Sequence, residues 1–162
     1  MRSLRSSRVP TRRSLELVAH EGPPSPRSWT ITSDIAQISG IVEAVTNFCV
    51  AAGFSSRLCR LNVPVALTEA LSNAIIAGNH GDPAREVRIV ASMDAESLLL
   101  EVTDEGDGFD ASQWRGSPDD ADWLERESGR GLFLMRALMD HVESRREPSP
   151  HGHTVQLRLR RA

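Results

Sequence analysis

Lysine is absent from this chain, and all 19 of its basic side chains are arginines. No mechanism that requires a lysine can therefore be built from these residues. Cysteine is nearly as scarce: only Cys49 and Cys59 occur, and they form neither a CxxC motif nor a pair with histidine. Both fall in predicted helices, where a cysteine is most often a buried structural residue. We therefore expect two buried structural thiols.

Long apolar runs are missing as well. No stretch approaches the roughly 20 residues that a membrane span requires, and no apolar signal-peptide core follows the N-terminus. The net charge of −3 gives no reason to expect a nucleic-acid partner. These absences favour a cytoplasmic protein that binds neither a membrane nor a nucleic acid.

What remains is the composition of a globular protein. The chain has 162 residues, of which 40% are hydrophobic and 25% charged, enough for one domain with a single core. Residues 1–27 differ, because they combine six arginines with serine and proline and contain only Glu16 and Glu21 as acids. We predict a disordered basic tail there, with a transit peptide or an overextended start as alternatives, and a folded domain over residues 28–162.

Hydrophobic periodicity predicts the elements of that domain. Helical spacing of apolar residues predicts three helices, from residue 35 to about 53, from about 57 to 77, and from 131 to 139. Alternation of polar and apolar residues predicts five strands, at residues 29–31, 87–93, 98–102, 142–146 and 154–160. This order predicts an α+β fold, a two-layer α/β sandwich whose mixed, mostly antiparallel sheet carries three helices on one face.

Two local features qualify that prediction. Pro64 lies inside the second predicted helix, so the helix either begins near Asn62 or kinks there. The sequence His151-Gly-His153 falls at the end of the last predicted hairpin. We interpret it as the hairpin tip rather than as a metal site.

A carboxylate and two glycines follow the third predicted strand, in the sequence Asp104-Glu-Gly106-Asp-Gly108-Phe. Glycine lets a backbone approach a ligand closely. The carboxylate of Asp104 can accept a hydrogen bond from a ligand amino group. One such loop is a weak signal by itself, but it indicates a ligand pocket at this end of the sheet.

Glu69 and Asn73 are four residues apart, so they share one face of the second predicted helix. An amide oxygen beside a carboxylate suits Mg²⁺, which prefers oxygen ligands and retains waters and substrate phosphates. The carboxylate of Glu69 is also placed to accept a proton from an attacking hydroxyl group. The alternative is the ordinary polar face of an amphipathic helix.

A third stretch, Gly129-Arg130-Gly131, precedes the last predicted helix. Free backbone N–H groups at a helix N-terminus favour phosphate, and glycine lets it come close; a simple glycine-containing loop is the alternative. Residues 110–128, just before this stretch, lose all periodicity. A loop of that length inside a compact domain is usually functional or mobile.

In this order and spacing, the three stretches resemble the motifs of the Bergerat-type (GHKL) ATP-binding superfamily of gyrase, Hsp90, histidine kinases and MutL. The run from Glu69 to Asn73 resembles its N-box, Asp104–Phe109 its first glycine box, and Gly129–Leu132 its second. Residues 28–161 look most similar to the bacterial anti-sigma-factor serine/threonine kinases of the RsbW and SpoIIAB type.

The resemblance implies ATP and Mg²⁺ as cofactors and assigns roles to individual residues. Asp104 would accept a hydrogen bond from the adenine amino group, and Gly106 and Gly108 would let the backbone pass under the base and sugar. Asn73 would hold Mg²⁺ between the phosphates, and Glu69 would act as the general base or orient the nucleophile.

The phosphate side of the site would come from the second glycine box and the loop before it. The box supplies four residues, Gly129, Arg130, Gly131 and Leu132. Residues 110–128 would form a lid over the nucleotide, and Arg126 within it is a weaker candidate for contacting the γ-phosphate.

The resemblance predicts a bacterial protein kinase that phosphorylates a serine or threonine of a small STAS-like antagonist. It also predicts that the chain sequesters a sigma factor in a partner-switching system, and it leaves a homodimer open. Residues 1–27 are too short for the dimerisation and phosphoacceptor segment of a sensor histidine kinase. The alternatives are an ATP- or ADP-binding regulatory module without transfer, because Ile76–Ala77 replaces a basic residue or histidine of many relatives, and a relic that binds no nucleotide.

Overall fold

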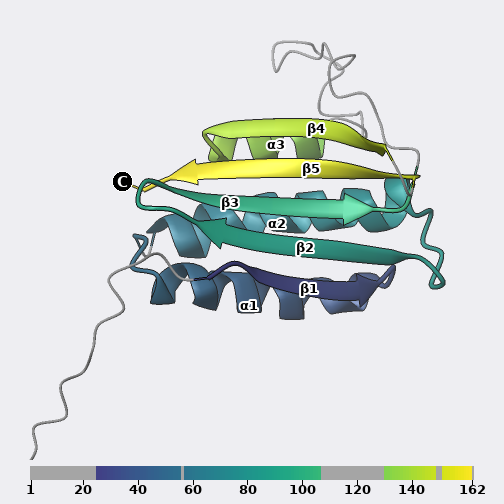
Figure 1. Cartoon of the computed structure of the whole chain (residues 1–162), viewed down its shortest axis with the longest axis horizontal. Helices are drawn as coiled ribbons and strands as arrows, with labels where there is room; N and C mark the ends of the chain where they lie inside the picture. The colour runs from purple at the N-terminus through teal and green to yellow at the C-terminus, as the bar shows by residue number, and fades with distance from the viewer. Residues whose placement is uncertain (1–24, 56, 107–129, 149–150, 162) are drawn as a thin grey trace, which may run out of the picture.

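A computed structural model describes residues 25–55, 57–106, 130–148 and 151–161 (Figure 1). The predicted basic tail, except for residues 25–27, and the whole predicted lid at 110–128 lie outside these ranges. The same is true of three predicted site residues, Gly108, Arg126 and Gly129. The two glycine boxes are therefore described only in part, through Asp104–Gly106 and from Arg130 onward.

Five strands form one sheet in the order β1-β2-β3-β5-β4 (Figure 1). Their bounds are β1 Arg27–Thr32, β2 Glu86–Met93, β3 Ser97–Asp104, β4 His141–Pro148 and β5 His151–Arg160. All four pairings are antiparallel, so the described sheet has no parallel pair. The predicted α+β class is confirmed. β5, the last strand in the chain, lies between β3 and β4.

Three helices cover one face of the sheet, as predicted (Figure 1). The helical elements are η1 Ile35–Gln37, α1 Ile38–Ala51, η2 Leu58–Asn62, α2 Val63–Ser72, η3 Asn73–Gly78 and α3 Arg130–Leu138. The second predicted helix is one continuous path built from η2, α2 and η3, of which η2 and η3 are π-helical. Pro64 lies in the first turn of α2, where a missing backbone N–H is tolerated.

Alternation along the strands explains how the core forms. Residues of β2 are buried and exposed in turn, because successive side chains point to opposite faces of a sheet. The buried side chains of the sheet meet Leu67 and Leu71 of α2, Val45 of α1 and Met135 of α3. The core members contributed by the sheet are Ile31, Val87, Ile89, Ala91, Met93, Leu98, Leu100, Val102, Val155, Leu157 and Leu159.

The turn between β2 and β3 is organised by Asp94. Its Oδ1 accepts hydrogen bonds from the backbone N–H of Glu96 at 2.8 Å and of Ser97 at 2.6 Å. These two backbone donors lower the pKa of the Asp94 carboxyl below its ordinary value, because they stabilise the ionised form. The predicted hairpin therefore has a specific polar turn that fixes its register.

Among the described residues, the stretch Leu58–Gly78 is long and apolar enough to cross a membrane when only length and composition are judged. Its mean hydropathy is 1.2, although polar and charged residues interrupt its apolar runs. The stretch contains Arg60 and Glu69 and packs against the sheet. Because core helices of folded domains satisfy the same criterion, the stretch is weak evidence for a membrane span.

Cys49 of α1 and Cys59 of η2 are joined by a disulfide, with 5.8 Å between their Cα atoms. The prediction that both are buried is confirmed, since neither side chain is exposed. The prediction that both cysteines carry free thiol groups is wrong, because their sulfur atoms are bonded to each other. Gly53, at a positive φ of 77°, turns the chain between the two helical segments and brings the cysteines together. The sequence predicted the break between the two helices but not that the two cysteines, ten residues apart, would pair.

Candidate functional site

A cavity of about 40 Å³ lies between the end of β3, the start of β5 and the α2–η3 helix. This volume is well below the roughly 300–1,000 Å³ of a typical small-molecule site, so the enclosed space holds only part of a ligand. Its lining residues are Ala70, Asn73, Ala74, Ala77, Gly78, Asp104, His153 and Val155. Asn73 and Asp104, which come from separate predicted motifs, therefore line the same cavity.

Asp104 is the last residue of β3, and only 5% of it is exposed. Carboxylates are rarely buried this far unless they are paired. Its Oδ1 accepts a hydrogen bond of 2.9 Å from the backbone N–H of Gly106. Its Oδ2 lies 3.8 Å from Nδ1 of His153. The strand thus presents an oriented acceptor to the cavity.

Two glycines make room for this carboxylate. A methyl group at position 78 would lie 2.5 Å from Cγ and 2.6 Å from Oδ2 of Asp104, so η3 passes directly against the carboxylate. A methyl group at position 106 would overlap the backbone carbonyl of Gly78. Gly106 is predicted to let the backbone pass under a nucleobase. It is also required because its backbone lies in contact with the backbone of Gly78.

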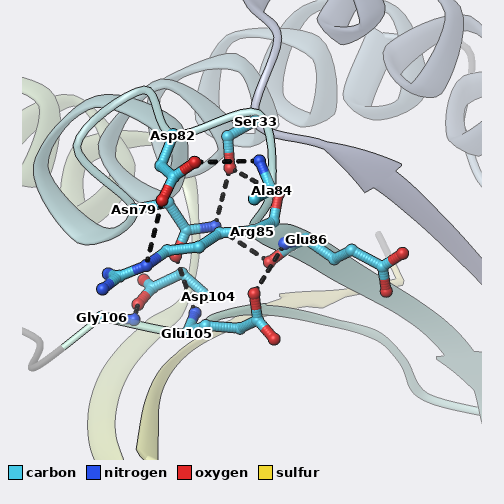
Figure 2. Close-up of polar contacts among 9 residues, drawn as sticks. All are labelled: Ser33, Asn79, Asp82, Ala84, Arg85, Glu86, Asp104, Glu105 and Gly106. Carbon is cyan, nitrogen blue, oxygen red and sulfur yellow. Dashed lines mark hydrogen bonds and ion pairs between the residues drawn. The ribbon is translucent and has the colours of Figure 1, made fainter.

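Asn79 holds these segments together and is fully buried (Figure 2). Its Nδ2 donates to Oγ of Ser33 and to the backbone carbonyl of Glu86, each at 2.9 Å. Its Oδ1 accepts from the backbone N–H of Glu105 at 2.8 Å. One side chain therefore ties the end of η3 to the residue that follows β1, to the first residue of β2 and to the loop that follows Asp104.

Glu69 and Asn73 are half-buried on the face of the helix that meets the start of α3. A methyl group at position 131 would lie 2.7 Å from Oε2 of Glu69 and 3.4 Å from Nδ2 of Asn73. The structure therefore brings the predicted N-box and the described part of the second glycine box into contact. Asn73 is also the first residue of the π-helical turn η3, and such turns often occur at functional sites.

The remaining members of the second glycine box divide between surface and core. Arg130 is exposed at the first position of α3, where its side chain is free to reach a ligand. Leu132 is 4% exposed and packs in the core, so only its backbone is available to a ligand. These placements are compatible with phosphate binding at the start of α3, which remains a prediction.

A protein-only metal site is absent from the described residues, because no three His, Cys, Asp or Glu side chains cluster there. Mg²⁺ does not require such a cluster, since it keeps waters and is often held through substrate phosphates. Asn73 therefore fits a magnesium ion that arrives with a nucleotide.

Comparison with known proteins agrees with this geometry. The model of a family described as the histidine kinase-like ATPase domain matches residues 31–159. The chain belongs to this family. The match contains every predicted site residue, from Glu69 to Leu132, and confirms the resemblance that the three motifs indicated.

Individual relatives are also similar to this chain and agree with the assignment to the ATPase family. The chain is 37% identical over 98 residues to an anti-sigma F factor of Halalkalibacterium halodurans, covering 59% of this chain and 66% of that protein. It is 29% identical over 87 residues to the serine-protein kinase RsbW of Oceanobacillus iheyensis, covering 51% of this chain and 55% of that protein. The chain thus matches less than two thirds of the length of either of these two relatives.

A solved structure supports the fold. The RsbU and RsbW domains of a Mycobacterium tuberculosis protein align with a TM-score of 0.62 and 18% identity, covering 86% of this chain and 33% of that one. At this identity the likeness establishes the shared fold of the ATPase domain and not a shared activity.

Sequence reasoning missed three residues of the site: Gly78, Asn79 and His153. The prediction that His153 lies at a hairpin tip is wrong, because β5 begins at His151 and His153 is paired with Asp104. Gly78 has no side chain and therefore gives no chemical signal in the sequence. The signal that could have singled out Asn79 is its place between two glycines, Gly78 and Gly81, at the helix exit.

Proposed function

We propose that this ATPase domain binds ATP with Mg²⁺ and acts as a serine/threonine protein kinase on a small STAS-like antagonist protein. The observation that carries the proposal is the single cavity that joins Asp104 to Asn73. Glu69 and the start of α3 lie directly beside Asn73. The names of the relatives, anti-sigma F factor and serine-protein kinase RsbW, support the same activity.

The Asp104 end of the cavity fits a nucleobase. An ionised carboxylate only accepts hydrogen bonds, so it selects an amino group such as that of adenine over a carbonyl. The cavity is otherwise lined mostly by alanines, glycine and Val155, which suits the flat face of a base. Gly78 and Gly106 keep the backbone close enough for this recognition.

The Asn73 end fits the phosphates and the metal. The amide oxygen of Asn73 would ligate Mg²⁺, and the backbone N–H groups at the start of α3 would receive phosphate. Arg130 would add a positive charge there, with Gly129, Gly131 and Arg126 as further predicted contacts. When bound, Mg²⁺ neutralises the charge that builds up on the transferred phosphoryl group.

Glu69 supplies the base. Its carboxylate would take the proton of the acceptor's Ser or Thr hydroxyl group. The hydroxyl oxygen then bonds to the γ-phosphorus, the bond from that phosphorus to the bridging oxygen breaks, and ADP leaves. This role is supported by the position of the Glu69 carboxylate beside the start of α3, where a methyl group added at Gly131 would lie 2.7 Å from Oε2.

The biological setting proposed here follows the names of the relatives. We infer that the chain acts in the bacterial cytoplasm, that it sequesters a sigma factor, and that phosphorylation of the antagonist regulates this. A homodimer is compatible with this proposal. Membranes and nucleic acids have no part in it.

A second function, nucleotide binding without transfer, is favoured by one observation. Ile76 is 61% exposed, and Ala77 next to it is also exposed and lines the cavity. Neither supplies a positive charge near the phosphates. A module of this kind would bind ATP or ADP and change partners without phosphorylating them.

Transfer of labelled phosphate separates the two functions. Purified protein is incubated with γ-labelled ATP, Mg²⁺ and STAS-domain proteins encoded in the same genome. The kinase proposal predicts label on one of them that disappears with Glu69→Ala and persists with Glu43→Ala, an exposed control on α1. Tight ATP binding without any label on the STAS proteins would contradict the kinase proposal and support the module.

A further inference from the structure

His153 occupies a position in the cavity to which the proposed mechanism assigns no task. It is the third residue of β5 and pairs with Asp104 on one side and with Arg146 of β4 on the other. Only 2% of the residue is exposed, and its side chain lines the same cavity as Asp104 and Asn73. An imidazole is therefore built into the wall of the proposed nucleotide site.

The two oxygens of Asp104 have different neighbours. Oδ1 accepts the backbone N–H of Gly106 at 2.9 Å, which fixes one side of the carboxylate. Oδ2 faces Nδ1 of His153 at 3.8 Å. On the opposite side, Gly78 has no side chain that could hold the carboxylate. Among the described side chains, His153 is the one in ion-pair range of Oδ2.

Only one of these two groups can donate a hydrogen bond to the other. An ionised aspartate carries no proton to donate, so any hydrogen bond between the two groups must come from Nδ1–H of His153. The separation of 3.8 Å is longer than a direct hydrogen bond. Contacts in ligand-free sites are often loose and shorten when the ligand binds.

We infer that His153 is a positioning residue for base recognition, which acts by orienting the Oδ2 side of the Asp104 carboxylate. This inference rests on the proposed function, because it assumes that Asp104 accepts a hydrogen bond from the 6-amino group of adenine. The effect of His153 should then be confined to nucleotides that carry this amino group. A residue that only filled space would affect every purine nucleotide alike.

The test compares two nucleotides that differ only in that group. Dissociation constants are measured for ATP and for purine riboside triphosphate, which has hydrogen in place of the 6-amino group, both with Mg²⁺. His153→Asn keeps a donor near the position of Nδ1, whereas His153→Gln moves it toward the position of Nε2. His141→Gln, an exposed histidine at the start of β4, is the matched control.

We expect His153→Gln to weaken ATP binding roughly tenfold, the effect of losing one hydrogen bond to a charged group. Binding of purine riboside triphosphate should change less than about twofold, which is within ordinary variation for a site that is not involved. His153→Asn and His141→Gln should bind both nucleotides as the wild type does. Equal weakening of both nucleotides by His153→Gln, or no weakening at all, would overturn the inference.

A measurement on the wild type keeps the inference testable if His153→Gln does not fold. In protein labelled with ¹⁵N-histidine, ATP should shift the Nδ1 resonance of His153, and purine riboside triphosphate should leave it nearly unchanged. Identical shifts with both nucleotides would contradict the inference. If ATP binds but no better than purine riboside triphosphate, base recognition by Asp104 is wrong; if neither binds, the proposed function itself fails.

Discussion

Two glycines and one asparagine, none of which would take part in the chemistry, set the distance between η3 and the end of β3. Gly78 and Gly106 are in contact through their backbones, and the carboxylate of Asp104 lies against Gly78. Asn79 then locks this arrangement with three hydrogen bonds. The recognition of a ligand by Asp104 therefore depends on neighbours that would never touch the ligand.

Replacement of Gly78 by alanine tests this dependence. Because the added methyl group would lie 2.5 Å from Cγ of Asp104, we expect a loss of about 1–3 kcal/mol in unfolding free energy. ATP affinity should also fall. Gly40→Ala in α1 is the control, since nothing lies within 4 Å of its new methyl group. It should stabilise the protein by up to about 1 kcal/mol, because alanine is the better helix former.

Urea denaturation of both variants checks this prediction. A Gly78→Ala variant with wild-type stability and wild-type ATP affinity would show that the carboxylate can move without consequence.

Replacement of Asn79 by alanine tests the hydrogen-bonded connection. The change would remove the buried side chain to which the Glu105 N–H and the Glu86 carbonyl bond, and both of these bonds are partly buried. We expect a cost of about 2–4 kcal/mol, since unsatisfied buried groups are expensive. Asn47→Ala, at an exposed position on α1, should change stability by less than about 0.5 kcal/mol. Thermal melts that place both variants at the same temperature would contradict this account.

Part of the site could be predicted at the level of single residues, and part could not. Glu69, Asn73 and Asp104 stood out because their residue types suit metal and base recognition and because the motifs resemble a known family. Asn79 and His153 did not, since their importance lies in contacts with residues far along the chain: Asn79 and Glu105 are 26 positions apart, and His153 and Asp104 are 49 positions apart. Sequence periodicity carries no information on such pairings.

At the scale of elements, apolar periodicity predicted the helices and strands, while their exact ends depended on pairing. β5 starts at His151, before its apolar alternation begins, because its first residues pair with the end of β3 and with β4. The π-helical turns η2 and η3 also escaped prediction, since they differ from an α-helix in hydrogen bonding and not in composition.

The disulfide between α1 and η2 gives a prediction about these elements. Closing a loop of this length is worth roughly 2–3 kcal/mol through the lost freedom of the unfolded chain. Reduction should therefore lower the melting temperature. Because Cys49 and Cys59 are the only cysteines, the double variant Cys49→Ser/Cys59→Ser should melt at the same temperature with and without reductant. A wild-type melt that does not respond to reductant would contradict the pairing.

The contact between α3 and α2 gives a second prediction. A methyl group at position 131 would meet the flexible end of Glu69, which can move aside at little cost in stability. We expect Gly131→Ala to fold normally and to lower phosphoryl transfer by displacing Oε2. Combined with Glu69→Ala, it should cause no further loss, because neighbours that act through one group are not additive. Additive losses in the transfer assay would show that Gly131 acts independently of Glu69.

At the scale of the whole molecule, the fold brings together three motifs that are far apart in the sequence. The end of β3 brings Asp104 to the cavity, the buried helix brings Asn73, and α3 brings Gly131 against Glu69. The order of the motifs in the chain, together with the family resemblance, predicted that they meet. It did not predict which residues would hold them at contact distance.

The central claim is that one nucleotide spans this cavity, with its base at Asp104 and its metal-bound phosphates at Asn73. Titration calorimetry with ATP, with and without Mg²⁺, tests the claim on the wild type, Asp104→Asn and Asn73→Ala, with Glu43→Gln as the surface control. We predict that Asp104→Asn weakens ATP binding roughly tenfold in both conditions, since it removes a charged acceptor. Asn73→Ala should weaken it only when Mg²⁺ is present. Wild-type affinity in both variants, or no binding of ATP by the wild type, would contradict the claim.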